Sequence, residues 1–324
     1  MRIASYKGQG GQPRSAVVVK NGGRDALIDL NDASGGRLPA SVLELLAGGD
    51  AALDEARRIA GNGASGGAQP RPIDSVDLLA PIQRPGKLIC VAGNFQKHIE
   101  EGGGQRVDKN VIVPKLFIKP STSIIGPGDP LVLPPVAERS TDWELELAIV
   151  MGRRGRDIPY ERALDYVAGY SIINDISGRS MDWNVEGRTP GGFDSFFDWL
   201  NGKWIDGFAA WGPWITTADE VKDPEGLDME LKVNDKVWQK GLTGDMIFNA
   251  AEIISFASQY MTWEPGDIIA GGTLDGTGDA SNVYLKAGDV MHGTIEGLGT
   301  LTTPVKARTS PTNLSWRSRM AARA

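Results

Sequence analysis

The chain has 324 residues, a formal net charge of -7, 41% hydrophobic residues and 23% charged residues. This length predicts about two domains, or one large catalytic domain with an appendage, and the composition is ordinary for a soluble globular protein. The acidic balance argues against nucleic-acid binding. Neither a membrane span nor a signal peptide is visible, so we expect a cytoplasmic protein without membrane association.

Residues 1–70 have the pattern of a small α+β domain. Strands are expected at 2–7, 15–20 and 26–30. A short helix is expected at 38–49, where two glycines, Gly48 and Gly49, stop it. Residues 60–72 are rich in Gly, Ala and Ser and end in prolines, which predicts a flexible linker to the next domain.

Residues 71–307 form short β-rich runs that follow repeated Gly-Asp turns, a pattern typical of hairpins and not of βαβ units. Two helices are expected, at 158–170 and at 244–261, the second with Asp245 as its N-cap. We therefore predict an α+β fold with a β-rich catalytic domain and helices on one side. Residues 308–324 are basic and turn-rich, which predicts a surface tail.

The stretch "STDWELELAIVMG" places two carboxylates on one face of a predicted strand. Glu144 and Glu146 are two residues apart and point the same way, followed on that face by Ala148 and Val150. Burying two like charges is costly, so a cation must offset them. Asp175 ends a later apolar strand and adds a third carboxylate. Such oxygen ligands suit Mg²⁺, Mn²⁺ or Ca²⁺, although solvated edge strands also carry Glu-x-Glu.

A series of motifs between residues 85 and 305 resembles the fumarylacetoacetate hydrolase family. They include "KLICVAGNFQKHIEE", "PKLFIKPSTSIIGPGDPLVLP", "DWELELAIVMGRRGRDI", "ALDYVAGYSIINDIS", "NGKW" and "EPGDIIAGGT". The resemblance implies a mixed β-roll with flanking helices, commonly a homodimer, and a site that holds Mg²⁺ or Mn²⁺, with Ca²⁺ as a substitute in crystals. The family's metal ligands match Glu144, Glu146 and Asp175.

The same resemblance assigns roles to five more residues. His98 is followed three residues later by Glu101, as in members that hydrolyse or decarboxylate, and on a helical turn the carboxylate would raise the basicity of the imidazole. The glycine-rich segment that follows predicts a mobile lid. Lys203 matches the lysine that faces the substrate's oxygens, while Arg179 and Thr273 match substrate-binding positions. For each of these residues the alternative is an ordinary solvated or structural side chain without a role in the site.

Three departures from the family pattern leave the substrate open. Ser180 and Asp182 stand where an aspartate and a glutamine are common, Trp204 and Ile205 follow Lys203 in place of a small residue and phenylalanine, and Leu274 stands where proline is usual. The segment between residues 181 and 203 carries three phenylalanines and two tryptophans, which either pack the rim or line a larger, partly apolar pocket.

The residues and the resemblance predict a metal-dependent hydrolase that cleaves a C–C bond in a 2,4-dioxo acid, such as an acylpyruvate from aromatic-compound catabolism. In this reading His98 and Glu101 activate a water, and the metal and Lys203 stabilise the enolate that forms. The alternatives are an isomerase or tautomerase, a decarboxylase, or a ureidoglycolate-type lyase that uses the same site. A non-catalytic small-molecule binder is a third possibility, but a binder needs no base.

Overall fold

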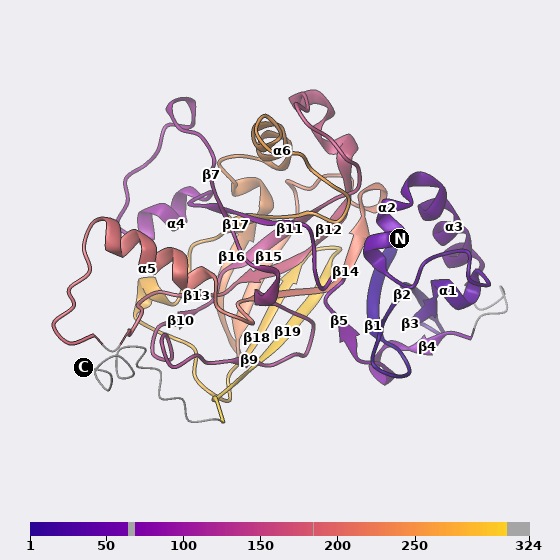
Figure 1. Cartoon of the computed structure of the whole chain (residues 1–324), viewed down its shortest axis with the longest axis horizontal. Coiled ribbons are helices and arrows are strands. Elements are labelled where there is room, and N and C mark those ends of the chain that lie inside the picture. The colour runs from indigo at the N-terminus through magenta and orange to yellow at the C-terminus, as the bar shows by residue number, and fades with distance from the viewer. Residues whose placement is uncertain (64–68, 184, 310–324) are drawn as a thin grey trace, which may run out of the picture.

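The computed structural model describes residues 1–63, 69–183 and 185–309. It shows the predicted mixed α+β fold, rich in strands and with few helices (Figure 1). The helices are α1 (Leu30–Ala33), α2 (Val42–Ala47), α3 (Gly49–Asn62), α4 (Gln96–Glu101), α5 (Phe193–Lys203) and α6 (Ala250–Ser258). The first strands are β1 (Arg2–Lys7), β2 (Pro13–Asn21), β3 (Arg24–Asp29), β4 (Arg71–Pro72), β5 (Leu78–Leu79), β6 (Leu88–Ala92), β7 (Lys115–Ile118), β8 (Ile124–Ile125), β9 (Leu131–Val132) and β10 (Thr141–Asp142).

The strands that follow complete three sheets. They are β11 (Leu145–Met151), β12 (Val167–Asp175), β13 (Ser177–Gly178), β14 (Ala209–Thr217), β15 (Asp228–Val233), β16 (Lys236–Leu242), β17 (Ile268–Thr273), β18 (Val290–Ile295) and β19 (Gly299–Lys306). The largest sheet has the order β4-β3-β2-β1-β14-β12-β11-β17-β6-β7, with β5 on β1 and β8 on β14. A smaller sheet has the order β16-β15-β18-β19-β9, and β10 pairs with β13.

The N-terminal strands belong to the same sheet as the predicted catalytic domain. In the pairing of β1 with β14, Arg2 lies opposite Thr216 and Ile3 opposite Ile215. The terminal amine of Met1 donates to Thr217 Oγ1 over 2.6 Å. The N-terminal part therefore continues the central sheet, and the domain boundary at residue 70 stays a prediction.

The two faces of β11 pack into different cores. Leu145 and Leu147 point toward the smaller sheet, together with residues of β15, β18 and β19. Ala148 and Val150 point the other way, into a core shared with the helices α2 and α3 and with β1. The alternation that the sequence predicts is confirmed, and it fixes the face on which the two glutamates lie.

The N-terminal helical region is longer than predicted. Helix α2 is capped by Ser41, whose side chain accepts from Glu44 N, and it ends before Gly48 as expected. Helix α3 then starts at once, because Gly49 adopts a φ of 64° that lets the chain turn between the two helices. Its last residues overlap the start of the predicted linker, whose residues 64–68 lie outside the described part of the chain. Most of the predicted tail, 310–324, also lies outside it.

Both helices predicted in the catalytic domain are shorter than expected. Asp245 is not the N-cap of α6: that position belongs to Asn249, which forms a capping box with Glu252. Between 158 and 170 only a 3₁₀ turn, Tyr160–Tyr166, forms before the chain enters β12. Pairing of β12 with β11 and β14 outweighs the local helical pattern there.

Helix α5 was not predicted, because its aromatic residues also suit a strand. Figure 1 shows α4 and α5 at the end of the molecule away from α1, α2 and α3. Among the described residues, no helix has the combined length and apolar character needed to cross a membrane.

Candidate active site

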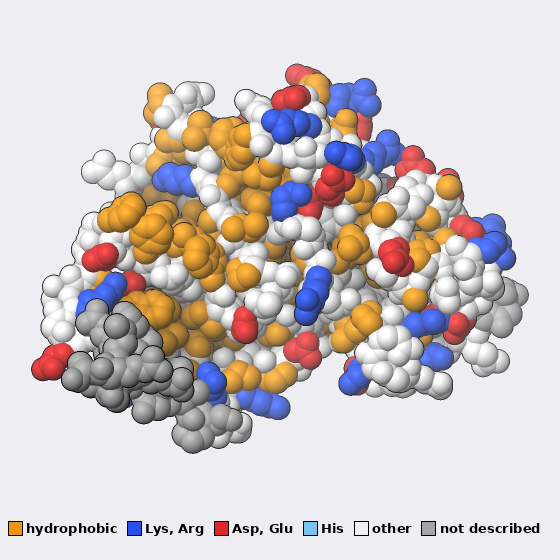
Figure 2. All heavy atoms as spheres, in the orientation of Figure 1, with side chains coloured by type: hydrophobic (Ala, Val, Ile, Leu, Met, Phe, Trp, Pro, Cys, Tyr) orange, Lys and Arg blue, Asp and Glu red, His pale blue; other side chains and the backbone are white. Residues whose placement is uncertain are grey.

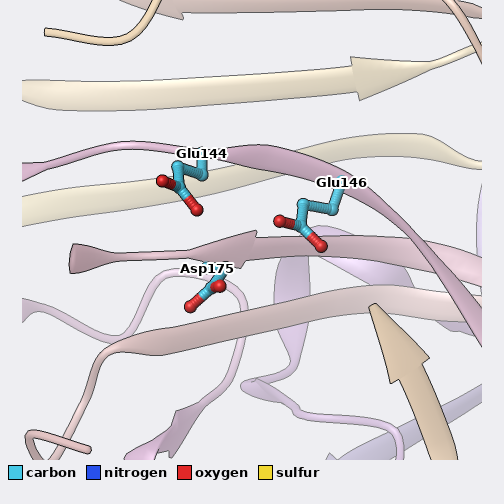
Figure 3. Close-up of side chains that lie close together, drawn as sticks. All are labelled: Glu144, Glu146 and Asp175. Atoms are coloured by element: carbon cyan, nitrogen blue, oxygen red, sulfur yellow. The ribbon is translucent and has the colours of Figure 1, made fainter. Parts of the chain in front are cut away.

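The three predicted metal ligands converge in the structure (Figure 3). One carboxylate oxygen from each of Glu144, Glu146 and Asp175 lies within 4.8 Å of the other two, and all three residues are buried. Strand pairing produces this arrangement: Glu146 lies opposite Ile173 of β12, and Asp175 N donates to Glu144 O over 2.9 Å. Two neighbouring strand ends therefore bring the carboxylates to one place.

Two buried amides hold the backbone behind these carboxylates. Asn174 Oδ1 accepts from Glu144 N over 2.9 Å. Gln239 Oε1 accepts from Leu145 N over 2.9 Å, while its Nε2 donates to Thr273 Oγ1 over 2.8 Å. Thr273 in turn donates its hydroxyl proton to Leu145 O over 3.0 Å. The Thr273 hydroxyl thus joins β11 to β17, and its predicted contact with substrate stays a prediction.

Two lysines share the carboxylate of Asp175. Lys203 Nζ lies 2.8 Å from Asp175 Oδ2 and 2.6 Å from Glu144 Oε2, and Lys119 Nζ lies 2.5 Å from Asp175 Oδ1. Burial alone would lower the pKa of Lys203, but Asp175 and Glu144 outweigh it and raise that pKa above its usual range. Lys203 is therefore the enclosed cation that the sequence predicts.

Arg179 completes the cationic side of the site. Its NH2 nitrogen forms an ion pair of 2.6 Å with Glu144 Oε1, and its Nε donates to Asp142 Oδ2 over 2.8 Å. Burial opposes ionisation of Glu144, but Lys203 and Arg179 outweigh it and lower the pKa of Glu144 to about 2. Arg179 touches a candidate ligand, and its predicted role in substrate binding stays a prediction.

Glu146 differs from the other two carboxylates in its partners. Its Oε2 accepts from Gly272 N over 2.8 Å, and within the described residues it forms no ion pair. Burial, Asp175 and Glu144 raise the pKa of Glu146 well above its usual range. A buried carboxylate without a cation, beside two others, fits a hard dication, whose charge would remove this penalty.

Gly272 can approach Glu146 only because it has no side chain. Its φ is 94°, and a Cβ there would lie 2.7 Å from Asn94 Cβ. The Asn94 amide donates to the backbone oxygens of Gly271 and Phe248, which fixes the chain on both sides of that contact.

The predicted histidine and glutamate form a pair on α4. His98 Nδ1 lies 2.8 Å from Glu101 Oε1, and the side chains are 20% and 16% exposed. Burial would raise the pKa of Glu101, but His98 and Gly276 outweigh it and lower that pKa. Glu101 Oε2 also accepts from Gly276 N over 2.7 Å, in the turn that follows β17, and β17 places Thr273 opposite Glu146, which attaches the pair close to the carboxylates.

Aromatic side chains surround Lys203 on the outer side. Its Nζ lies 5.4 Å from the ring centre of Phe117 and 6.0 Å from that of Trp199, and these two rings meet edge to face at 5.0 Å. Farther out on α5, Phe193 and Phe196 are 76% and 51% exposed. Figure 2 shows hydrophobic side chains gathered over this end of the molecule.

Sequence reasoning missed Lys119 and Asp142. Lys119 follows the apolar run "LFI", and a single lysine directly after an apolar run can indicate an enclosed cation. Asp142 precedes the Glu-x-Glu pair, and nothing in its spacing predicts that it is completely buried. Cys90 is a buried residue of β6.

The β-rich scaffold and the buried carboxylates beside a His–Glu pair define a class of enzyme domain with an acidic metal-type site. The chain belongs to the fumarylacetoacetate hydrolase family: the model of the fumarylacetoacetate (FAA) hydrolase C-terminal domain matches residues 87–306. This confirms the resemblance found in the sequence.

Similar proteins carry several activities in their names. The chain is 34% identical over 311 residues to oxaloacetate tautomerase fahd2, mitochondrial, of Xenopus laevis, covering 94% of this chain and 90% of that protein. It is 37% identical over 295 residues to the human oxaloacetate tautomerase FAHD2A, mitochondrial, covering 89% and 86% of the two chains. These relatives match nearly the whole chain, including the N-terminal part.

Solved structures add a hydrolase with its ligands. A maleylpyruvate hydrolase from Sphingobium sp. SYK-6, in complex with a manganese (II) ion and pyruvate, is 32% identical, with a TM-score of 0.71 and coverage of 95% of this chain and 99% of that one. A 5-carboxymethyl-2-hydroxymuconate delta-isomerase from Mycobacterium smegmatis is 28% identical, with a TM-score of 0.69 and coverage of 95% and 100%.

Proposed function

We propose that the chain is a divalent-metal-dependent enzyme that tautomerises an oxaloacetate-like 2-oxo acid. The observation that carries this proposal is the His98–Glu101 pair, 2.8 Å apart, beside three buried carboxylates that fit a dication. Relatives of 34% and 37% identity that bear the name oxaloacetate tautomerase support it. Glu144, Glu146 and Asp175 would hold Mg²⁺ or Mn²⁺, and the bound ion would supply a Lewis acid for the substrate's carboxylate and keto oxygens.

The His98–Glu101 pair moves the proton. Because Glu101 is a carboxylate that faces Nδ1, it keeps the proton of the imidazole on Nδ1 and leaves Nε2 as the basic atom. Nε2 takes a proton from the carbon next to the keto group and returns it to the enolate oxygen, which yields the enol without any co-reactant. The reverse sequence converts the enol to the ketone.

Two buried lysines supply fixed positive charge. As the carbon loses its proton, negative charge grows on the former keto oxygen, and the ammonium groups of Lys119 and Lys203 lie beside the carboxylates that would face it. Both are almost completely buried, so their charge acts in a medium of low polarity and needs little rearrangement. Asp175 and Glu144 keep Lys203 protonated.

The second candidate is hydrolysis of a C–C bond in a 2,4-dioxo acid, the reaction that the sequence predicts first. It is favoured by the similar maleylpyruvate hydrolase with its manganese ion and pyruvate. In this case His98 would take a proton from water, and the water oxygen would attack the distal carbonyl. The bond to the pyruvate-type fragment would then break and leave an enolate.

Product analysis separates the candidates. We would strip the protein with a chelator, restore Mg²⁺ or Mn²⁺, and follow the enol absorbance of oxaloacetate beside the products formed from acylpyruvates. A metal-dependent approach to keto–enol equilibrium, without CO₂ or fragments, supports the tautomerase. Two carbon fragments per water consumed would establish the hydrolase, and release of CO₂ would establish a decarboxylase. If no 2-oxo acid is turned over, the proposal is wrong and a small-molecule binder is favoured.

The proposed assembly is a homodimer, as the family resemblance implies, and the proposed location is the cytoplasm. Sedimentation at micromolar concentration should give twice the mass of the 34.7 kDa chain. A species with the mass of one chain would contradict the dimer without affecting the reaction.

A further inference from the structure

The turn after β17 anchors the glutamate of the proposed base pair. Gly276 N donates to Glu101 Oε2 over 2.7 Å, and the hydroxyl of Thr277 donates to Glu101 Oε1 over 2.9 Å. Because His98 Nδ1 contacts the same Oε1, the position of this turn sets the position of the imidazole. Helix α4 has no side-chain hydrogen bond at its N-cap, so contacts from outside the helix, such as these, contribute more to holding it.

A second carboxylate holds the other side of the same turn. Asp142 is completely buried, and its Oδ1 accepts from Gly278 N over 2.7 Å. Its Oδ2 accepts from Asp279 N over 3.1 Å and from Arg179 Nε over 2.8 Å. Four consecutive residues of the turn thus contact one of two carboxylates. Gly276 and Thr277 contact Glu101, and Gly278 and Asp279 contact Asp142.

Close packing leaves the turn little freedom to find another position. Gly276 has a φ of 91°, and a Cβ there would lie 1.9 Å from Trp238 O. A Cβ on Gly278 would lie 2.0 Å from Val283 O and 2.6 Å from Asp142 Oδ1. The backbone can reach both carboxylates only because these two residues are glycines.

We propose that Asp142 is a positioning residue for the His98–Glu101 pair and acts through the turn at 276–279. This inference rests on the proposed function, which makes that pair the base. Asp142 touches no reacting atom: it fixes the amides of Gly278 and Asp279, and the turn presents Gly276 and Thr277 to Glu101. Misplacing a catalytic group by about 1 Å can cost on the order of 10²-fold in rate.

Asp142 is also connected to the metal ligands, and the experiment must distinguish this connection from the one through the turn. Arg179 joins it to Glu144, a candidate metal ligand, through an ion pair of 2.6 Å. If Asp142 acted by that route, its loss would weaken metal binding. Action through the turn instead predicts a lower kcat with an unchanged affinity for Mn²⁺.

The experiment is a double-mutant cycle between D142N and E101Q. D142N keeps one acceptor oxygen and removes the other, so it tests the turn with the smallest change of shape. We expect D142N to lower kcat by about 10²-fold, E101Q by a similar or larger factor, and the double variant no further than E101Q alone. The proposal is wrong if the fold losses of kcat in the two single variants multiply in the double variant. It is also wrong if Mn²⁺ affinity falls by the same factor as kcat.

Two further variants serve as controls. T277V removes one hydrogen bond to Glu101 and should lower kcat less than D142N does, again with unchanged Mn²⁺ affinity. D267N removes another completely buried carboxylate, at the opposite end of β17, and should leave kcat unchanged. If D267N lowers kcat as much as D142N, general loss of a buried charge explains the effect and the positioning role is wrong.

A readout without turnover keeps this inference separate from the proposed function. Hydrogen–deuterium exchange in the metal-free protein should rise in D142N for the peptides that contain α4 and the turn, and stay unchanged in D267N for the same peptides. Should D142N fail to fold, T277V is measured in the same way. If exchange in α4 does not respond to either variant, the turn does not hold the helix and the inference fails, whatever the enzyme's reaction is.

Discussion

The three carboxylates and the His98–Glu101 pair lie on different kinds of element. Glu146 belongs to a central strand that is paired on both sides, and Asp175 ends its neighbour. His98 and Glu101 belong to the six-residue helix α4. Paired strands fix side chains through many backbone hydrogen bonds, whereas a short helix depends on a few contacts from outside.

This difference implies that metal binding and base positioning can be separated by mutation. The carboxylates are in place because the sheet places them, even where their mutual repulsion is unfavourable. The base pair is in place because a neighbouring turn holds it. Substitutions in one region should therefore leave the other region's function intact.

The largest effect is expected from E146Q. This change removes the carboxylate that has no cationic partner among the described residues, so Mn²⁺ binding and metal-dependent turnover should both fall, by about 10³-fold or more. In the absence of metal the variant should be at least as thermostable as the original, because glutamine still accepts from Gly272 and a buried charge is gone. Titration calorimetry and melting curves test this, and a less stable metal-free variant would contradict it.

H98A should lower turnover by about 10²–10⁴-fold and leave Mn²⁺ affinity unchanged. The reason is that His98 belongs to α4 and not to the paired strands that carry the carboxylates. Steady-state kinetics and Mn²⁺ titration on the same preparation are sufficient. Full activity of H98A on the true substrate would show that another residue is the base. The His98–Glu101 pair would then have no part in catalysis.

The stability of the metal-free protein should depend on pH through Glu146. Its pKa is raised in the folded protein, so between the ordinary glutamate pKa and the folded value the folded state binds more protons than the unfolded state. Stability therefore falls as pH rises through that window, and it recovers in mild acid. Melting temperatures across pH, compared with those of E146Q, measure this contribution, which saturating Mn²⁺ should abolish. Parallel curves for the two proteins would refute it.

The smallest effect is expected from W199A. Trp199 lies beside Lys203 and Phe117 on the outer side of the site, so its loss should raise KM for 2-oxo acids with an apolar distal group by about tenfold or less, with little change for oxaloacetate. F193S, at the far exposed end of α5, is the matched control and should change neither value. If both variants change KM equally for both substrates, these aromatic side chains only pack the rim of the site and do not select the substrate.

The sequence predicts the carboxylate site better than its surroundings, for physical reasons. Alternation along a strand determines which side chains share a face, so Glu144 and Glu146 can be placed together from spacing alone. The ends of neighbouring strands are less certain: the apolar strand that ends at Asp175 indicates a third ligand, and the family resemblance supports it. The i, i+3 spacing of His98 and Glu101 likewise predicts a contact that forms.

Contacts between distant segments could not be predicted in this way. Lys119 follows β7 and Asp142 belongs to β10, and no local pattern specifies which segments these two residues contact. The N-cap of α6 was misplaced because Asp245 and Asn249 are both good caps, and the fold uses Asp245 in a tight turn. Helix α3 was overlooked because two glycines suggested an end, whereas one of them allows a restart.

The most direct test of the central claim is a crystal of the protein grown with Mn²⁺ and pyruvate, with diffraction data that locate manganese by its anomalous scattering. We expect one strong peak bound by oxygens of Glu144, Glu146 and Asp175, with the pyruvate beside it. A site without manganese at saturating concentration, with Lys203 still bridging Glu144 and Asp175, would contradict it.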